Sequence, residues 1–165
     1  METDPEIGVF PAGYTANRRG TPRLCDPSYM ACVFCAISSG ELSASVVARD
    51  ERFCAFLDAR PVFKGHVLVV PREHVADLAA LPEPMAGPLF WLARRVALAL
   101  EEGLGAQGAF VGVNNKISQS VPHLHIHVVP RTKGDGLRGF FWPRTKYQSD
   151  EERDGYARRI AGALR

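Results

Sequence analysis

The 165-residue chain has no long apolar run, no strong excess of either charge and only four cysteines. The longest apolar segment, 89–100, is interrupted by Arg94 and Arg95 and is shorter than the roughly 18–20 residues that a membrane span needs. Twenty lysines and arginines against 18 aspartates and glutamates leave a net charge of +2, which disfavours nucleic acid as the main partner. The acidic start of the chain, with Glu2 and Asp4, has the wrong charge for a signal peptide. We therefore expect a cytoplasmic protein.

Two of the four cysteines, Cys32 and Cys35, form a C-x-x-C pair. In a reducing compartment a disulfide framework is disfavoured, and such a pair indicates metal binding or redox chemistry. Thioredoxin-like redox activity is the poorer interpretation, because no strand–C-x-x-C–helix pattern is evident and the two residues between the cysteines are apolar. A complete zinc site needs about four ligands, so two more have to come from elsewhere in the chain.

The pattern of apolar residues predicts an α+β domain. Residues 1–28 hold four prolines and no sustained period, so we expect an irregular N-terminal arm there and a single domain over 29–165. Apolar runs and turn residues predict strands at 46–47, 53–57, 66–70, 108–114 and 124–129, a helical turn at 77–81, a long helix at 84–102 and a C-terminal helix at 149–164. Together these elements predict an antiparallel sheet with helices packed on it.

Three of the five histidines alternate with apolar residues in one segment, 122–129. Side chains on a strand alternate between its faces, so the three histidines share one face and the apolar residues between them face the core. A row of imidazoles suits two chemistries: a three-histidine metal site that activates water, or nucleophilic catalysis by a neutral imidazole. The histidines are His123, His125 and His127, with Leu124, Ile126 and Val128 on the other face.

Polar residues before this strand favour the second chemistry. The run Ser118-Gln119-Ser120 supplies hydroxyl and amide groups where the chain enters the strand, and two asparagines and a lysine precede it. Such donors suit phosphate oxygens and developing negative charge, and a bare metal site has no need of them. A free imidazole has a reference pKa of about 6.5 and is largely neutral, hence nucleophilic, at pH 7.

This segment resembles the motif of the histidine triad (HIT) family, with Gln119-Ser120-Val121 before the histidines and Val128-Val129 closing the run. Three further stretches, 32–35, 56–58 and 64–71, follow in that family's order and spacing, and Gly134-Asp135-Gly136 resembles its bacterial members. The resemblance covers about residues 32–138. It implies a HIT-like fold with about five antiparallel strands, a long central helix and a C-terminal helix.

The resemblance implies a nucleotide-binding hydrolase or transferase that acts at the α-phosphate. The middle histidine, His125, would attack phosphorus and form a covalent nucleotidyl-histidine, from which water or another acceptor releases the nucleoside monophosphate. His127 would contact the phosphate and the departing group, and His66 would line the same site. The other implied contacts are the phosphate oxygens for Ser120, Gln119 and Asn114, the ribose hydroxyls for Asp58, and the base for Phe34, Ile37 and Phe56.

Several of these residues also have ordinary structural interpretations, which stay open at this point. Asp58 is placed to close a turn, because a proline follows shortly after it. Phe34 and Phe56 suit a hydrophobic core as well as a pocket wall. Ser120 and Gln119 suit a turn before the strand.

The resemblance also implies a structural zinc ion and no organic cofactor. Bacterial relatives with this C-x-x-C pair look like zinc binders that use both cysteines, a downstream histidine and the first histidine of the triad, here Cys32, Cys35, His74 and His123. The family is typically dimeric, so we expect a homodimer. We place the aromatic segment 137–147 near the mouth of the pocket, where Trp142 or Arg144 would touch the distal half of the substrate.

The main alternative is a non-catalytic, zinc-stabilised module that binds a nucleotide or a protein. It would explain the four zinc ligands but would leave His125, His127 and Asp58 without a role. For the enzyme, the sequence leaves open whether the scissile bond is a phosphoramidate or the phosphoanhydride of a dinucleoside polyphosphate. It also leaves the base open.

Overall fold

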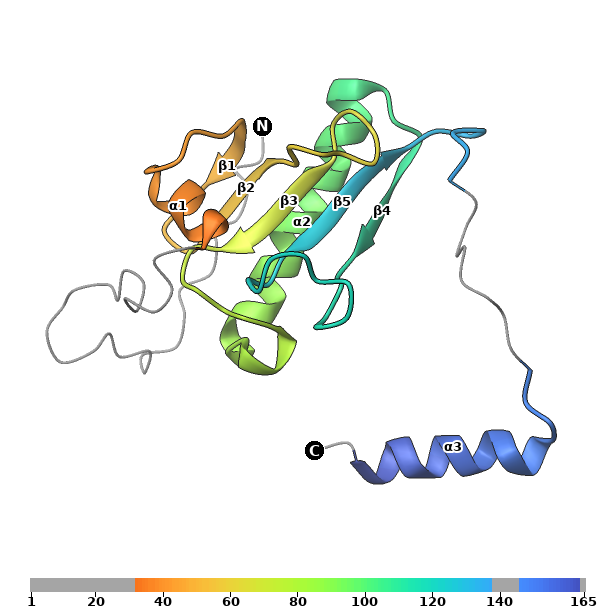
Figure 1. The fold of residues 1–165 in the computed structure, drawn as a ribbon. Helices are drawn as coiled ribbons and strands as arrows, with labels where there is room; N and C mark the ends of the chain where they lie inside the picture. The colour runs from red at the N-terminus through yellow and green to blue at the C-terminus, as the bar shows by residue number, and fades with distance from the viewer. Residues whose placement is uncertain (1–31, 138–145, 164–165) are drawn as a thin grey trace, which may run out of the picture. The chain divides into compact units, whose positions relative to one another are not determined.

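The computed structural model of the chain describes residues 32–137 and 146–163 (Figure 1). The described residues fall into two compact units, which divide between Lys133 and Gly134. The expected N-terminal arm, 1–28, lies outside the described residues, as do Trp142 and Arg144. Among the described residues, no helix is both long enough and apolar enough to cross a membrane.

The first unit is built on a five-stranded antiparallel sheet with the order β1-β2-β3-β5-β4 (Figure 1). This confirms the predicted antiparallel α+β architecture. The strands are β1 (Val46–Arg49), β2 (Phe53–Leu57), β3 (Val67–Pro71), β4 (Gly108–Gly112) and β5 (Ile126–Arg131). Strand β5, into which the histidine segment leads, therefore lies inside the sheet, between β3 and β4.

Only the strand predicted at 53–57 has the predicted bounds: β1 ends later than expected, β4 ends earlier, and β3 and β5 both begin and end later. The starts of β3 and β5 differ because backbone groups are used outside the sheet. Strand β3 begins after His66, whose N–H donates to Phe63 O in a turn. Strand β5 begins at Ile126 rather than at Leu124, because the Leu124 N–H donates to Val75 O, in the segment after β3. His123 and His125 therefore precede the ladder, and only His127 lies within it.

The helices of the first unit are α1 (Val33–Ser39) and α2 (Glu83–Leu104), with a short 3-10 turn, η2 (Leu78–Ala80), between them. We did not predict α1. Its end is marked by Gly40 in the left-handed conformation, a glycine signal that the sequence did contain. Helix α2 also ends later than predicted, since Gly105 rather than Gly103 takes the left-handed cap position.

The second unit contains α3 (Asp150–Ala163), close to the predicted C-terminal helix. The Glu152 N–H donates to Ser149 Oγ, the main-chain half of the capping box that the sequence predicts.

Strands β2 and β3 are buried on both faces of the sheet, and their alternate residues take opposite sides. Val67 and Val69 face the apolar stripe of α2, whereas Leu68 and Val70 face α1. The α2 stripe is buried as predicted: Leu89, Leu92, Val96 and Leu100. The apolar residues between the histidines, Leu124, Ile126 and Val128, join this α2-side core, which confirms their predicted orientation. The histidines therefore project to the α1 side.

We predict that Gly65→Ala destabilises the protein by about 1–2 kcal/mol, the cost of a left-handed backbone conformation for an L-residue. Gly65 has φ +95°, and an added Cβ would approach Leu104 Cδ1 to 2.5 Å. Gly87→Ala is the matched control, because Gly87 lies inside α2 with no atom within 4 Å of an added Cβ. Denaturant unfolding should show a lower free energy of unfolding for the first variant only. Equal stability of the Gly65 variant and wild type would contradict the left-handed backbone conformation at Gly65.

Candidate active site and metal centre

Two cysteines and two histidines meet beside the start of α1. Cys32 is the residue before the helix and Cys35 lies in its first turn, while His74 follows β3 and His123 precedes β5. Their ligand atoms all lie within 4.8 Å of one another. The Sγ–Nδ1 distances are 3.4 Å from Cys32 to His123, 3.3 Å from Cys35 to His74 and 3.5 Å from Cys35 to His123. Sulfur and nitrogen ligands of a tetrahedral zinc ion are separated by about 3.5 Å, so the cluster has the size of a zinc site.

The backbone fixes how His123 faces this cluster. Its Nε2 lies 2.8 Å from Pro71 O, and a carbonyl can only accept, so the proton is on Nε2 and the lone pair on Nδ1. Burial lowers the pKa of His123 to about 4, so the ring is neutral at pH 7. A neutral imidazole with its other nitrogen bonded to a carbonyl is the usual state of a metal ligand.

The C-x-x-C pair spans the start of α1, with Cys32 as the residue before the helix and Cys35 in its first turn. Whether a strand comes before the pair is not tested, because the preceding residues lie outside the described part of the chain. The surroundings of the sulfur atoms nevertheless favour metal binding over disulfide chemistry. Each sulfur atom lies within 3.5 Å of a histidine nitrogen. These two histidines bring the ligand count to the four of a closed structural site.

A second cluster joins Asp58, His66 and His127. His66 Nε2 lies 3.0 Å from His127 Nδ1, and Asp58 Oδ2 lies 3.4 Å from His66 Nδ1. Burial lowers the pKa of His66, against the opposing attraction of the Asp58 carboxylate, and burial lowers the pKa of His127 to about 4. Both rings are therefore neutral at pH 7.

The hydrogen bonds of this cluster assign a proton to each ring. The Val62 N–H donates to His66 Nδ1 at 3.3 Å, slightly closer than the Asp58 Oδ2 at 3.4 Å, and with Nδ1 as the acceptor of this bond the His66 proton lies on Nε2. That Nε2–H donates to His127 Nδ1, so His127 carries its own proton on Nε2. His127 Nε2 is buried and has no hydrogen-bond partner among the described residues. It is a donor that a substrate oxygen or nitrogen can satisfy.

On the His125 ring the proton lies on Nδ1, and not on Nε2 as in His127. Its Nδ1 lies 2.6 Å from the backbone oxygen of His123, so Nδ1 carries the proton and Nε2 keeps its lone pair. The ring meets Phe34 and His127 edge to face, with centroid distances of 5.2 and 4.8 Å. His125 and His127 thus present a nucleophilic nitrogen and a donor nitrogen from adjacent rings.

The residues expected around the base are buried on the α1 side of the sheet. Phe34, Ile37 and Phe56 belong to one apolar cluster, and Phe34 meets Phe56 edge to face at 5.4 Å. They pack the core there, and Phe34 also borders His125.

Asp58 has the turn contact that the sequence left open, and it also faces a histidine. Its Oδ1 accepts from the Arg60 N–H at 2.8 Å in a turn, and its Oδ2 faces His66.

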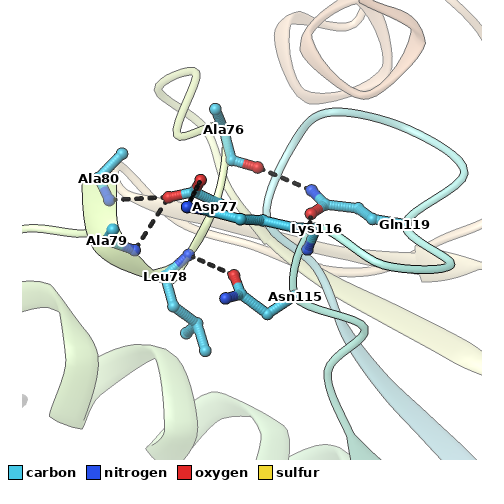
Figure 2. Close-up of polar contacts among 8 residues, drawn as sticks. All are labelled: Ala76, Asp77, Leu78, Ala79, Ala80, Asn115, Lys116 and Gln119. Carbon is cyan, nitrogen blue, oxygen red and sulfur yellow. Dashed lines mark hydrogen bonds and ion pairs between the residues drawn. The ribbon is translucent and has the colours of Figure 1, made fainter.

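The residues expected to bind phosphate differ in their surroundings. Asn114 and Ser120 are exposed. The amide of Gln119 is used within the loop, where its Oε1 accepts from the Lys116 N–H and its Nε2 donates to Ala76 O (Figure 2). Sequence reasoning missed Asp77, which caps η2 and was signalled only by its place before a helical turn.

These features define an α+β protein whose inner strand and its approach carry a row of imidazoles beside a Cys/His cluster. The chain belongs to the histidine triad (HIT) family, because the family model described as the HIT domain matches residues 39–134.

Solved structures and a characterised relative agree with this assignment. A HIT family member from Bacillus subtilis superposes with a TM-score of 0.74 at 32% identity, covering 82% of this chain and 98% of that one. A zinc-bound histidine triad family protein from Mycobacterium smegmatis has a TM-score of 0.64 at 36% identity, covering 82% of this chain and 99% of that one. An adenosine 5′-monophosphoramidase from Schizosaccharomyces pombe is 32% identical over 74% of this chain and 90% of its own length.

The lowered histidine pKa values predict that the metal-free protein loses stability in acid. His123 and His127 have folded pKa values of about 4 against an ordinary value of 6.5. Between these values the unfolded chain binds more protons than the native one, so the free energy of unfolding falls as pH falls through this window. Urea unfolding of chelator-treated protein from about pH 7 to about pH 5 measures this slope.

The variant His127→Asn tests the contribution of His127 to this pH dependence. Its amide oxygen can still accept from His66 Nε2, but the side chain does not titrate. Its stability should depend less steeply on pH than that of wild type. An equal or steeper dependence would contradict the assignment of a neutral His127.

Proposed function

We propose that the protein hydrolyses nucleoside phosphoramidates at the α-phosphate through a covalent nucleotidyl-His125 intermediate. The observation that carries the proposal is the 2.6 Å contact between His125 Nδ1 and His123 O, which leaves Nε2 as an unprotonated nucleophile. The monophosphoramidase activity named for the Schizosaccharomyces pombe relative favours a phosphoramidate over a dinucleoside polyphosphate.

In the first step, His125 Nε2 forms a bond to phosphorus and the P–N bond of the substrate breaks. The electron pair of that bond leaves with the amine, which takes up one proton from solvent. The His127 Nε2–H donates a hydrogen bond to the phosphoryl group or the departing amine. The His125 Nδ1–H stays on the carbonyl of His123, where it stabilises the positive charge that the ring acquires.

In the second step, water forms a bond to phosphorus, and the electron pair of the P–Nε2 bond returns to His125. The water releases one proton, which balances the proton taken up by the amine. The products are the nucleoside monophosphate and the free amine, and His125 returns to its neutral tautomer.

The remaining contacts are assigned from the residues around these rings. Asp58 Oδ2 accepts from the ribose hydroxyls, since a carboxylate suits a vicinal diol. Ser120 and Asn114, both exposed, donate to the phosphate oxygens. The base lies against the apolar wall that contains Phe34, Ile37 and Phe56.

The substitution His125→Ala should lower the release of AMP from adenosine phosphoramidate at least about 1,000-fold, because it removes the nucleophile. The measurement is hydrolysis followed by chromatography, with diadenosine tetraphosphate as the second substrate and circular dichroism as the folding control. A well-folded variant that retains wild-type turnover would refute the covalent mechanism. If wild type cleaves neither substrate, the non-catalytic binding module becomes the better description.

We also propose that Cys32, Cys35, His74 and His123 hold one structural zinc ion. The donor set supports this, because two thiols and two imidazoles lie at zinc-ligand spacing and His123 presents its Nδ1 lone pair. The zinc-bound Mycobacterium smegmatis protein is similar to 82% of this chain. The ion would tie α1 to the approach of the histidine strand, and it takes no part in the phosphoryl-transfer steps.

Metal analysis tests this site without an activity assay. Wild type purified with zinc should contain about one ion per chain, as a closed four-ligand site requires, whereas Cys35→Ser should contain much less. Cys54→Ala is the control, because Cys54 is fully buried in the apolar cluster under α1 and should not change the zinc content. Equal zinc in the Cys35 variant and wild type would show that the ion is held elsewhere.

We retain the prediction of a cytoplasmic homodimer. The homodimer is supported by two large aromatic residues of α2, because Phe90 is 60% exposed and Trp91 is 55% exposed. Large aromatic residues of this kind are enriched at protein interfaces.

A further inference from the structure

The loop before the histidine strand is tied by side chains to the segment that follows His74 (Figure 2). Asn115 Oδ1 accepts from the Leu78 N–H at 2.9 Å. Gln119 Nε2 donates to Ala76 O at 2.7 Å. We call these two bonds, with the Gln119 Oε1 that accepts from the Lys116 N–H at 2.9 Å, the latch.

The loop that the latch closes has a backbone conformation that its own residues disfavour. Lys116 and Ser118 have φ values of 68° and 60°, in the left-handed region that favours glycine. Such a conformation persists when neighbouring contacts over-determine it. The latch supplies contacts of this kind, and one of them bonds the backbone of Lys116 itself.

An ion pair also joins the two segments, but it contributes less than the latch to holding them together. Asp77 Oδ2 lies 3.5 Å from Lys116 Nζ, and the lysine side chain is 63% exposed. Solvent screens such a pair. Asp77 acts mainly as a cap, because its Oδ1 accepts from the Ala79 and Ala80 N–H groups, and the Ala80 bond is the largest cause that holds its pKa below the usual range.

The two latched segments carry the groups on which the proposed chemistry depends. One contains His74 and leads through Val75 to η2, and the other leads through Ser120 to His123 and His125. They are joined a second time by the Leu124 N–H, which donates to Val75 O at 2.6 Å. Ser120 therefore lies between two fixed points, the latch on one side and the Leu124 bond on the other.

We propose that Gln119 and Asn115 are positioning residues, which hold the loop so that Ser120 and His125 keep their relative placement, and that Gln119 is not a phosphate ligand. This inference rests on the proposed function. Both polar ends of the Gln119 side chain are already bonded within the latch, so contact with phosphate would break it. Loss of placement by a fraction of an ångström lowers the rate of the chemical step more than it weakens substrate binding.

The test compares Gln119→Met with a matched control, Gln107→Met. Gln107 Oε1 accepts from the Lys133 N–H at 2.7 Å, an equivalent bond between a glutamine and a lysine backbone at the other end of β4 and β5. Asn115→Ala removes the second latch bond, and Asn115→Asp restores an acceptor for the Leu78 N–H. Each protein is measured for kcat and KM on adenosine phosphoramidate and for amide hydrogen exchange over residues 75–125.

Gln119→Met should lower kcat about 5- to 20-fold with KM changed less than about 2-fold, which corresponds to the loss of one or two hydrogen bonds. Hydrogen exchange should rise at Lys116 in Gln119→Met and at Leu78 in Asn115→Ala, and in both it should extend through 120–125. The Gln107 variant should match wild type, and Asn115→Asp should recover most of the kcat that Asn115→Ala loses. An unchanged kcat, or a raised KM at constant kcat, would overturn the proposal, and the latter would make Gln119 a substrate ligand.

The exchange data separate this proposal from the proposed function. If wild type does not hydrolyse the phosphoramidate, the proposed function fails, and the latch is judged by exchange alone. Faster exchange that extends through 120–125 in Gln119→Met but not in Gln107→Met would still support the latch. Faster exchange confined to 115–119 would overturn it.

Discussion

The hydrogen bond from His125 Nδ1 to the backbone oxygen of His123 determines what the site can do. A carbonyl oxygen only accepts, so this contact leaves the lone pair of His125 on Nε2. The carbonyl is itself held in place, because the next residue, Leu124, is buried in the α2-side core and its N–H bonds to Val75 O. The reactive tautomer is therefore set by the backbone, whose bonding does not change with pH. No second titrating side chain is needed to select it.

The hydrogen-bond partner of one ring nitrogen also decides which nitrogen carries the proton in the other two histidines of the row. His123 donates from Nε2 to Pro71 O and offers Nδ1 to the sulfur atoms, whereas His125 donates from Nδ1 and offers Nε2. His127 accepts at Nδ1 from His66 and keeps its proton on Nε2. Burial lowers the pKa values of His123 and His127 to about 4, so the neutral forms on which these assignments depend persist at pH 7. In the proposed site, these three rings would thus serve as a metal ligand, a nucleophile and a donor.

The sequence predicted the parts of the fold that depend on alternation and on runs of apolar residues. Leu124, Ile126 and Val128 face the α2-side core as expected, because a residue's face in a strand follows from its parity. The seven-residue α1 was missed, since it has few turns in which a period can be detected. The end of α2 was misplaced because two glycines, Gly103 and Gly105, stand close together and the second takes the left-handed conformation that ends the helix. The bonds of Gln119 were beyond sequence reasoning, because its partner Ala76 contributes a backbone carbonyl and leaves no side-chain signal. The roles proposed for the site residues remain predictions.

Helix α1 links the proposed metal centre to the ring of His125. A helix of seven residues is too short to be stable alone, since isolated helices shorter than about 12–15 residues are marginal in water. It is held by Phe34 and Ile37, which are buried against the sheet, and by the contacts of Cys32 and Cys35 with His74 and His123. Phe34 stands between the two cysteines in sequence and packs on the ring of His125. A change in the position of the cysteines must therefore move Phe34, because one turn of helix carries all three side chains. In this way the proposed metal centre, which takes no part in the proposed bond breaking, would fix the position of Phe34 beside the proposed nucleophile.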